Sequence, residues 1–409
     1  MNILYVTPYV PSHIRTRPYN LIRVLVHLGH QVTLLTAAGT SPEEQAQADE
    51  LRTWGVQVEV FPVSLARSLR NCLRALPTRE PLQALFSYHP GLERRLRGLL
   101  REEAFGFDIV HIEHLRAARL VRATGGIPTV YDAVDCISLL FEQAIQHGAQ
   151  LRSRLMTAVD LARTRRYEAR LLTQYDQVVV TSQRDKHALG RLARRYLLPQ
   201  AQVAPITVVT NGVDLEYFHP SNVQHPTSNF QPPTVIFTGK MSYHANVAAV
   251  LYFAREVLPH IWARDPDVRF QIVGKDPPEA VRQLATDRRI QVTGTVDDLR
   301  PYLAQATVAV CPALYAVGVQ NKVLEAMAMG TPVVSTPAGC TALAAEEGRE
   351  ILIADDNEAL AAAILRAVSD HALAERLAVA GRQYVEAHHS WESEARWLVE
   401  IYGEARSEA

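Results

Sequence analysis

The segment from residue 318 to residue 334, GVQNKVLEAMAMGTPVV, combines residue types that could bind a charged ligand. Its apolar spacing predicts a short helix with one buried face, ended by Gly330 and followed by a strand. Lys322 and Glu325 are three residues apart and therefore share one face of that helix. The free N–H groups and positive dipole end of a helix that begins near Gly318 favour an anion. The segment thus combines a cation, a carboxylate and an anion-binding helix start.

Glycine ends three predicted strands in the same half of the chain, and lysine follows two of these glycines. The residues are Gly239-Lys240, Gly274-Lys275 and Gly294. In open parallel sheets, ligands bind outside the carboxyl ends of the strands. Glycine there lets a phosphate approach the backbone, and lysine supplies a point charge. Together with the helix start, these residues predict a nucleotide-diphosphate site.

Apolar, strand-like runs alternate with helix-like stretches along the whole chain. They lie at residues 3–7, 31–36, 56–63, 108–113, 128–134, 177–182 and 206–214, and then at 234–239, 268–274, 290–294, 308–313, 332–336 and 351–355. Near-continuous hydrophobic strands between helices predict parallel sheets covered on both faces. Residues 217–233 hold four prolines and almost no aliphatic residues, which indicates a domain boundary. The expected fold class is α/β, with two doubly wound parallel-sheet domains.

Composition excludes several classes of protein. The 409 residues are too many for one compact core, and the formal net charge of −1 does not favour a nucleic-acid partner. No apolar run approaches the roughly 20 residues that span a bilayer, and the N-terminus is predicted as a first strand. The four cysteines form no C-x-x-C pair, which argues against a disulfide framework or a zinc site. We expect a cytoplasmic protein.

Five segments carry a resemblance to a known family. They are ITVVTNGVDLEYFHP (206–220), VIFTGKMSYHANVAAVLYFAREVLPHI (235–261), FQIVGKDP (270–277), VTGTVDDLRPYLAQATVAVCPA (292–313) and GVQNKVLEAMAMGTPVVSTPAGC (318–340). With them the chain resembles the retaining GT-B glycosyltransferases of family 4, and it is most similar to the subgroup of exopolysaccharide and surface-glycan loci. The resemblance implies two Rossmann-like domains facing across a cleft.

The resemblance also implies a separate binding function for each domain. Residues 1–216 form an acceptor domain, 217–233 a linker, and 234–388 a donor domain, with a last helix at 389–405 that packs back on the first domain. Glu325 matches the second glutamate of a Glu-x7-Glu motif, which accepts hydrogen bonds from the donor ribose. The positions that bind the pyrophosphate and line the donor pocket in the family correspond here to Gly318, Asn321, Lys322, Lys240, Gly239, Gly274, Lys275 and Gly294.

Two departures from the family pattern bear on function. The first glutamate of the motif would fall at position 317, where this chain has Val317, so its contacts to the donor sugar differ. The loop after the first strand, residues 7–20, lacks the glycines that many members have. Arg15 and Arg17 are expected either to replace that backbone at the diphosphate or to bind an anionic acceptor.

The end of the fourth strand, DIVHIEH, offers a second set of candidates. By the family register, Glu113, flanked by His111 and His114, would position the acceptor or act as a base. A plain strand end with a buried His111 and a solvated His114 is an equally weighted alternative. Metal is not expected, because these three side chains alternate across the strand.

Aspartates complete the candidate set. Asp132 and Asp135 follow the next strand, where one could bind the acceptor hydroxyl, although helix capping or a loop hydrogen bond explains them as well. We place Lys240, Glu113 and Asp132 in the catalytic set. The pair Asp265 and Asp267 mimics a metal-binding Asp-x-Asp, but it is predicted to lie in a turn.

Residues 64–101 are rich in arginine and leucine. One interpretation is a basic amphipathic surface for an anionic membrane, where a lipid-linked acceptor would lie. The alternative is a set of solvated helix faces, which the prolines at 77, 81 and 90 favour. A second basic run, residues 152–172, resembles an ordinary surface helix.

The sequence therefore favours a retaining, metal-independent glycosyltransferase of surface polysaccharide or glycoconjugate synthesis. It would need no cofactor, and would use a UDP- or GDP-sugar as co-substrate and a glycan or lipid-linked acceptor, with peripheral contact to the cytoplasmic face of the membrane. Two alternatives stay open: a degenerate nucleotide- or glycan-binding relative, and a nucleotide-sugar epimerase on the same fold. No G-x-G-x-x-G motif follows the first strand of either half, which argues against a nicotinamide dehydrogenase.

Overall fold

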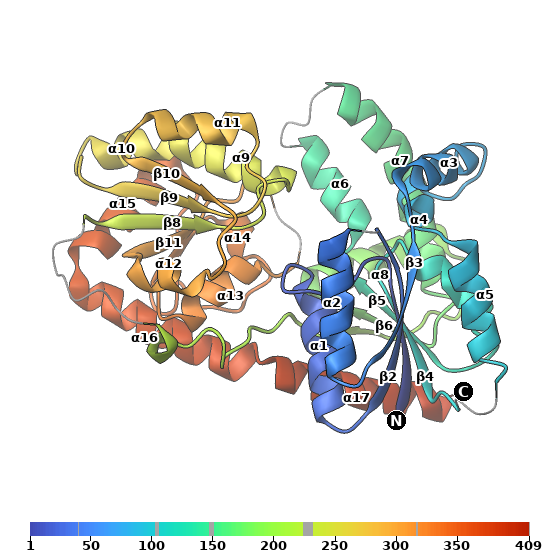
Figure 1. The fold of residues 1–409 in the computed structure, drawn as a ribbon. Helices are drawn as coiled ribbons and strands as arrows, with labels where there is room; N and C mark the ends of the chain where they lie inside the picture. Colours follow the sequence, from blue (N-terminus) through green and yellow to red (C-terminus); the bar gives the residue numbers. More distant parts are fainter. Residues whose placement is uncertain (40, 103–105, 147–150, 224–231, 316–317, 409) are drawn as a thin grey trace. The chain divides into compact units, whose positions relative to one another are not determined.

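The computed structural model describes residues 1–39, 41–102, 106–146, 151–223, 232–315 and 318–408. These residues form two compact α/β units, shown in Figure 1. Unit 1 is Met1–Thr210 together with Trp391–Ala409, and unit 2 is Asn211–Ser390. Each predicted strand appears, and all but one lie within two residues of their expected bounds; the run predicted at 206–214 forms a strand only at Ile206–Val208. The predicted fold class, two parallel-sheet α/β domains, is confirmed.

Unit 1 is built on a parallel sheet that has seven strands within the described residues, in the order β3-β2-β1-β4-β5-β6-β7. The strands are β1 (Asn2–Thr7), β2 (Gln31–Ala38), β3 (Gln57–Pro62), β4 (Ile109–Glu113), β5 (Thr129–Val134), β6 (Gln177–Val180) and β7 (Ile206–Val208). Residues of β1 and β4 are almost all buried, as expected for a sheet covered on both faces.

Helices cover both faces of that sheet (Figure 1). They are α1 (Thr16–His27), α2 (Pro42–Thr53), α3 (Leu65–Ala75), α4 (Leu82–Phe86), α5 (Pro90–Leu99), the 3-10 helix η1 (Ala118–Ala123), α6 (Ile137–Gln146), α7 (Leu151–Leu171), α8 (Gln183–Tyr196) and the C-terminal α17 (Trp391–Glu408). Side-chain oxygens of Ser41, Ser64 and Ser182 accept hydrogen bonds at the starts of α2, α3 and α8. Helix α17 packs on α1, and Leu398 and Tyr402 join the core of unit 1.

Unit 2 repeats the plan with a parallel sheet in the order β10-β9-β8-β11-β12-β13. Its strands are β8 (Thr234–Thr238), β9 (Arg269–Val273), β10 (Ile290–Gly294), β11 (Val308–Cys311), β12 (Val333–Ser335) and β13 (Leu352–Ile353). Its helices are η2 (Pro220–Asn222), α9 (His244–Tyr252), the π-helix η3 (Phe253–Val257), α10 (Leu258–Trp262), α11 (Glu279–Arg282), η4 (Gln283–Thr286), α12 (Arg300–Gln305), α13 (Asn321–Ala328), α14 (Pro337–Cys340), α15 (Asn357–Ser369) and α16 (His371–His388).

The junction between the units lies earlier than the sequence indicated. The boundary was expected after residue 216, with a linker at 217–233, but residues 211–223 pack within unit 2. Val213 joins the core of that unit, and its N–H donates to the carbonyl of His389 at 2.8 Å. Arg382 donates to the carbonyl of Phe218 at 2.6 Å. The first residues of the expected linker are thus held by contacts within unit 2, and residues 224–231 of it lie outside the described residues.

In the portion of the chain that the structure describes, no helix combines the length and the apolar character needed to cross a bilayer.

Candidate functional site

The carboxyl ends of three strands in unit 2 form one continuous edge. Strand β9 lies between β8 and β10, so their ends are neighbours. The hydrogen bonding continues past the strands: Gly239 N–H donates to the Val273 carbonyl at 3.0 Å, and Gly274 N–H donates to the Gly294 carbonyl at 3.2 Å. The three glycines that were expected at strand ends are therefore brought together.

Gly239 and Gly274 have a structural reason to be glycine. Their φ angles are 145° and 159°. A Cβ on Gly274 would lie 1.9 Å from the carbonyl oxygen of Gly239, and a Cβ on Gly239 would lie 2.8 Å from Nδ2 of Asn246. That amide donates to the carbonyl of Lys240 at 2.9 Å and so fixes the loop. Close packing of the two loops therefore requires glycine at both positions.

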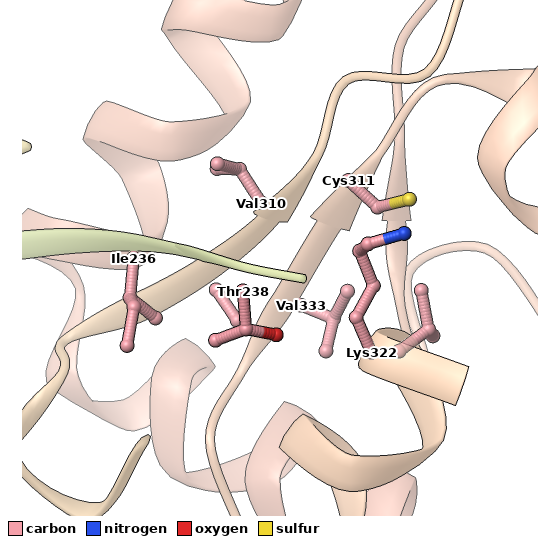
Figure 2. Close-up of a pocket in the computed structure, with 8 residues that line it drawn as sticks. Ile236, Thr238, Val310, Cys311, Lys322 and Val333 are labelled. Carbon is pink, nitrogen blue, oxygen red and sulfur yellow. The ribbon is translucent and has the colours of Figure 1, made fainter. Parts of the chain in front are cut away.

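Lys322 brings helix α13 to the same edge. Its Cε lies within 3.4 Å of the Cβ position of Gly239. Its ammonium donates to Oε1 of Gln320 at 3.1 Å and lies 5.5 Å from the ring centre of Phe237. Figure 2 shows the lysine reaching toward Cys311 across a small pocket. The pocket is lined by Ile236, Thr238, Ala309, Val310, Cys311, Lys322, Val323 and Val333.

Glu325 lies three residues further along α13 and is half-buried. Among the described residues, no group donates a hydrogen bond to its carboxylate. Burial raises the pKa of Glu325 to about 7, and the charge of Lys322 opposes that rise. A carboxylate in this setting has acceptor capacity that the protein itself does not use, which suits the hydroxyls of a ligand.

The start of α13 is held by its neighbours. Oδ1 of Asn321 accepts a hydrogen bond from Nδ2 of Asn211 at 3.1 Å. Gly318 has a φ of 62°, a conformation that favours glycine. Gly318 thus sets the backbone direction before the helix, and Asn321 is held by a side-chain contact at its first residue. The prediction for Val317 lies outside the described residues.

Lys240 and Lys275 lie on adjacent loops at this edge. The N–H of Met241, next to Lys240, donates to the carbonyl of Lys275 at 2.8 Å. The Lys240 side chain is exposed, and within the described part of the chain its ammonium makes no hydrogen bond or ion pair. Unit 2 therefore places Lys240, Lys275 and Lys322 near strand ends; the Lys240 side chain is exposed, and Lys275 and Lys322 are half-buried.

A buried network of charged groups lies at the carboxyl ends of β4 and β5 in unit 1. Glu113 and Asp132 are register partners on these strands, and both are completely buried. Nε of Arg17 donates to Oδ2 of Asp132 at 2.8 Å. Nη1 of Arg17 donates to the carbonyls of Val209 and Thr210 at 3.0 and 3.1 Å. Arg17 is therefore an interior residue that joins α1 to the ends of β5 and β7.

Glu113 holds the loop after β1 in place. Its two oxygens accept hydrogen bonds from the hydroxyls of Tyr5, at 2.9 Å, and Tyr9, at 2.6 Å. The guanidinium of Arg15, which is exposed, lies 4.5 Å from the ring centre of Tyr9. Burial raises the pKa of Glu113 to about 7, the charge of Asp132 adds to the rise, and the Tyr9 hydrogen bond opposes it. Glu113 thus anchors Tyr9, which supports Arg15.

His111 lies beside these carboxylates. Its Nδ1 is 2.8 Å from the hydroxyl of Tyr402, and its ring stacks on Tyr5 with centroids 4.1 Å apart. Burial lowers the pKa of His111 well below its ordinary value, and the charge of Arg17 lowers it further, so the ring is neutral. Burial raises the pKa of Asp132, and Arg17 opposes that rise.

The potential ligand atoms of His111, Glu113 and Asp132 lie within 4.8 Å of one another. The sequence-based expectation that no group of metal ligands would converge considered only His111, Glu113 and His114. It did not include Asp132 on the neighbouring strand β5. His111 and Glu113 are two residues apart and share a face of β4, where Asp132 of β5 joins them. The guanidinium of Arg17, however, already supplies a positive charge at Asp132.

The other candidate residues are His114, Asp135 and the pair Asp265 and Asp267. His114 is half-buried with a φ of 70°, and burial lowers its pKa to about 3. Asp135 accepts a hydrogen bond from Oγ1 of Thr181 at 3.1 Å, and burial raises its pKa to about 7. The N–H of Asp267 donates to Oδ1 of Asp265 at 3.2 Å, which confirms the turn.

Three residues of the network escaped the sequence reasoning. Tyr5 and Tyr9 appeared only as members of a strand and its loop, although the alternation of β1 places Tyr5 on the face of His111. Tyr402 lies 291 residues from its partner His111, and no local pattern connects them.

Comparisons with known proteins agree with this architecture. A model described as "Glycosyl transferase 4-like domain" matches residues 14–212, and one described as "Glycosyl transferases group 1" matches residues 232–370. The chain is 25% identical over 415 residues to phosphatidyl-myo-inositol mannosyltransferase of Mycolicibacterium smegmatis, an alignment that covers 98% of this chain and 93% of that protein.

Two further proteins are similar. Alpha-maltose-1-phosphate synthase of the same organism is 30% identical over 221 residues, which cover 48% of this chain and 56% of that protein, so the match spans about half the length of each. The crystal structure of Anabaena HepE in complex with UDP-glucose has a TM-score of 0.66 at 15% identity, covering 99% of this chain and 100% of that one. With both halves matched by glycosyltransferase models and a shared two-sheet fold, the chain belongs to the glycosyltransferases of the GT-B type.

Proposed function

We propose that the chain is a retaining, metal-independent glycosyltransferase that uses a nucleotide-diphosphate sugar and a glycan or lipid-linked acceptor. The observation that carries the proposal is the edge of unit 2. There the Lys322 side chain lies beside Gly239, and Glu325 offers a half-buried, unused carboxylate on the same helix. The Lys322 ammonium beside Gly239 suits the anionic end of a ligand. The Glu325 carboxylate, three residues further along the helix, suits hydroxyl groups at the other end of that ligand.

The two ends of the donor would bind different groups. The diphosphate would lie against the glycine edge, with Lys322 and Lys240 offsetting its charge. The ribose hydroxyls would donate to Glu325, which must then be ionised. Because the pKa of Glu325 is about 7 without ligand, donor binding would favour the charged form and strengthen as the pH rises through 7.

The transfer itself needs little from protein acids. In same-face attack, the acceptor hydroxyl oxygen bonds to the anomeric carbon as the bond from that carbon to the phosphate oxygen breaks. The hydroxyl proton passes to the departing phosphate oxygen. Lysines preorganised at the diphosphate stabilise the charge that develops there, an effect of about 3 kcal/mol per good donor. The retaining outcome rests on the family resemblance of segments 235–261 and 318–340.

Unit 1 would supply the acceptor side, and its buried network would act by positioning. Glu113 and Asp132 are completely buried, so contact of either with the substrate stays a prediction. The contacts support an indirect role instead, in which Glu113 fixes Tyr9 and Tyr9 carries the exposed Arg15. Arg15 is thus the better candidate for touching an anionic acceptor. The mannosyltransferase relative, by its name, acts on a phosphatidyl-inositol, which supports a lipid-linked acceptor here.

The test is an assay of products with purified protein in EDTA. UDP- and GDP-sugars are supplied with a panel of glycan and lipid-linked acceptors, and the anomeric configuration of the product is read by NMR. A new glycoside with the donor's anomeric configuration supports the proposal. An isomerised sugar nucleotide formed without acceptor would indicate an epimerase, and ligand binding without any product would indicate a binding relative. Either result would overturn the proposed activity.

A further inference from the structure

Helix α3 of unit 1 presents its leucines to solvent. The exposed fractions of Leu65, Leu69, Leu73 and Leu76 are 69%, 57%, 66% and 51%. At 100° per residue along a helix, these four side chains fall within an arc of about 80°. They therefore form one continuous apolar stripe, whereas isolated surface leucines are common and need no explanation.

The opposite face of α3 packs on the protein with small and polar residues. Ser68, Asn71 and Ala75 are its buried members, and Nδ2 of Asn71 donates to the carbonyl of Tyr88 at 2.9 Å. This arrangement inverts the usual pattern of a surface helix, in which the large apolar residues face the core. The leucines of α3 thus contribute little to the core of unit 1, and the inversion points to an external partner.

Arginines flank the leucine stripe. Arg67, Arg70 and Arg74 lie together on the next part of the helix surface, and Arg79 follows in the turn. Residues 64–79 contain these four arginines and no acidic residue. Within the described part of the chain, none of the four makes an ion pair with a carboxylate. Nearby, Nη2 of Arg163 from α7 donates to the carbonyl of Leu76 at 2.8 Å and so brings a further cation to the end of the stripe.

We propose that α3 docks unit 1 onto an anionic lipid bilayer, with its leucine stripe inserted at the interface and its arginines on lipid phosphates. An apolar stripe beside a cationic one is the pattern of helices that lie in a membrane interface. Charge decides between occupants: a second copy of the chain would bring two arginine-rich faces together, whereas an anionic bilayer complements them. The helix is already formed and capped by Ser64, so binding does not have to order it.

This inference deepens the proposed function, because a lipid-linked acceptor lies at such a surface. It does not depend on the donor site: α3 belongs to unit 1, and the glycine edge with Lys322 belongs to unit 2. Loss of lipid binding and loss of nucleotide binding can therefore be measured separately.

The experiment is flotation of the full chain with two kinds of vesicle, phosphatidylcholine alone and phosphatidylcholine with about one third phosphatidylglycerol. The test variants are L69S/L73S and R70Q/R74Q. The controls are L198S, at a leucine of unit 1 outside α3 that is 69% exposed, and R191Q/R194Q, which removes the same charge from the exposed face of α8. Melting curves and nucleotide affinity establish that each variant folds and retains its donor site.

We expect wild-type chain to bind the anionic vesicles and not the neutral ones. L69S/L73S should weaken that binding by about tenfold or more, R70Q/R74Q by about fivefold for each arginine, and the controls by less than about twofold. Equal binding to both kinds of vesicle, no binding to either, or equal losses in the α3 and control variants would overturn the proposal. So would sedimentation evidence that the stripe mediates self-association, abolished by L69S/L73S, without vesicle binding.

Discussion

Replacing Glu325 with glutamine should stabilise unit 2 while weakening the donor site. The pKa of this carboxyl is about 7 in the folded chain, against an ordinary value of 4.5. The folded state therefore binds more protons than the unfolded state between these values, and stability falls as the pH rises from about 4.5 to 7. Glutamine has no charge to bury, so the variant should lose this pH dependence.

The size of the effect follows from the shift in pKa. A change from 4.5 to about 7 corresponds to an upper limit of about 3 kcal/mol at alkaline pH. The side chain retains some exposure, which screens its charge, so we expect about 1–2 kcal/mol for E325Q at pH 8 and little difference near pH 5. For a unit of this size, that gain raises the melting temperature by about 3–6 °C.

Although E325Q should stabilise the fold, it should lower the affinity for the donor. A hydrogen bond to a charged acceptor contributes about 1.5–3 kcal/mol, so E325Q should bind a nucleoside diphosphate about 10- to 100-fold more weakly at pH 8. The assays are melting curves at pH 5 and pH 8 and calorimetry at pH 8. The matched control is E375Q, an exposed carboxylate past the first turn of α16 in the same unit, which should change neither quantity. A less stable E325Q, or one with unchanged affinity, would refute the reasoning.

Other predictions test neighbouring parts of the site. K322A and K240A should each lower affinity for a nucleoside diphosphate more than affinity for the nucleoside, and equal losses by calorimetry would show that the lysine does not contact phosphate. G274A should destabilise unit 2 by at least about 2 kcal/mol in urea unfolding, because its Cβ would lie 1.9 Å from the Gly239 carbonyl; an unchanged midpoint would contradict the close approach. EDTA should leave transfer activity intact, and a loss that magnesium restores would refute metal independence.

Local patterns predicted the fold and part of the site for identifiable reasons. Continuous apolar runs between helices indicated both parallel sheets, because buried strands leave that pattern in the sequence. The proximity of Gly239, Gly274 and Gly294 followed from their places at the ends of strands. The place of Gly274 at a strand end could not reveal that the backbone of Gly239 approaches it too closely for any side chain.

The network in unit 1 could not be predicted in the same way. Arg17 and Asp132 are 115 residues apart, and the register of β4 with β5 is needed to bring Glu113 next to that pair. The sequence identified residues 64–101 as amphipathic and basic, but periodicity does not say which face of a helix is buried. The exposed leucines of α3 became evident only from packing.

The central claim is that unit 2 binds a nucleoside diphosphate through the glycine edge, Lys322 and Glu325. The most direct measurement is a thermal-shift panel of UDP, GDP, ADP and TDP, each beside its nucleoside, in EDTA. A ligand at about 100 times its dissociation constant stabilises the folded state by about 2.7 kcal/mol. We expect one diphosphate to raise the melting temperature of wild-type chain by several degrees, its nucleoside to do much less, and K322A to lose most of the shift. No shift with any diphosphate, or an equal shift in K322A, would contradict the account.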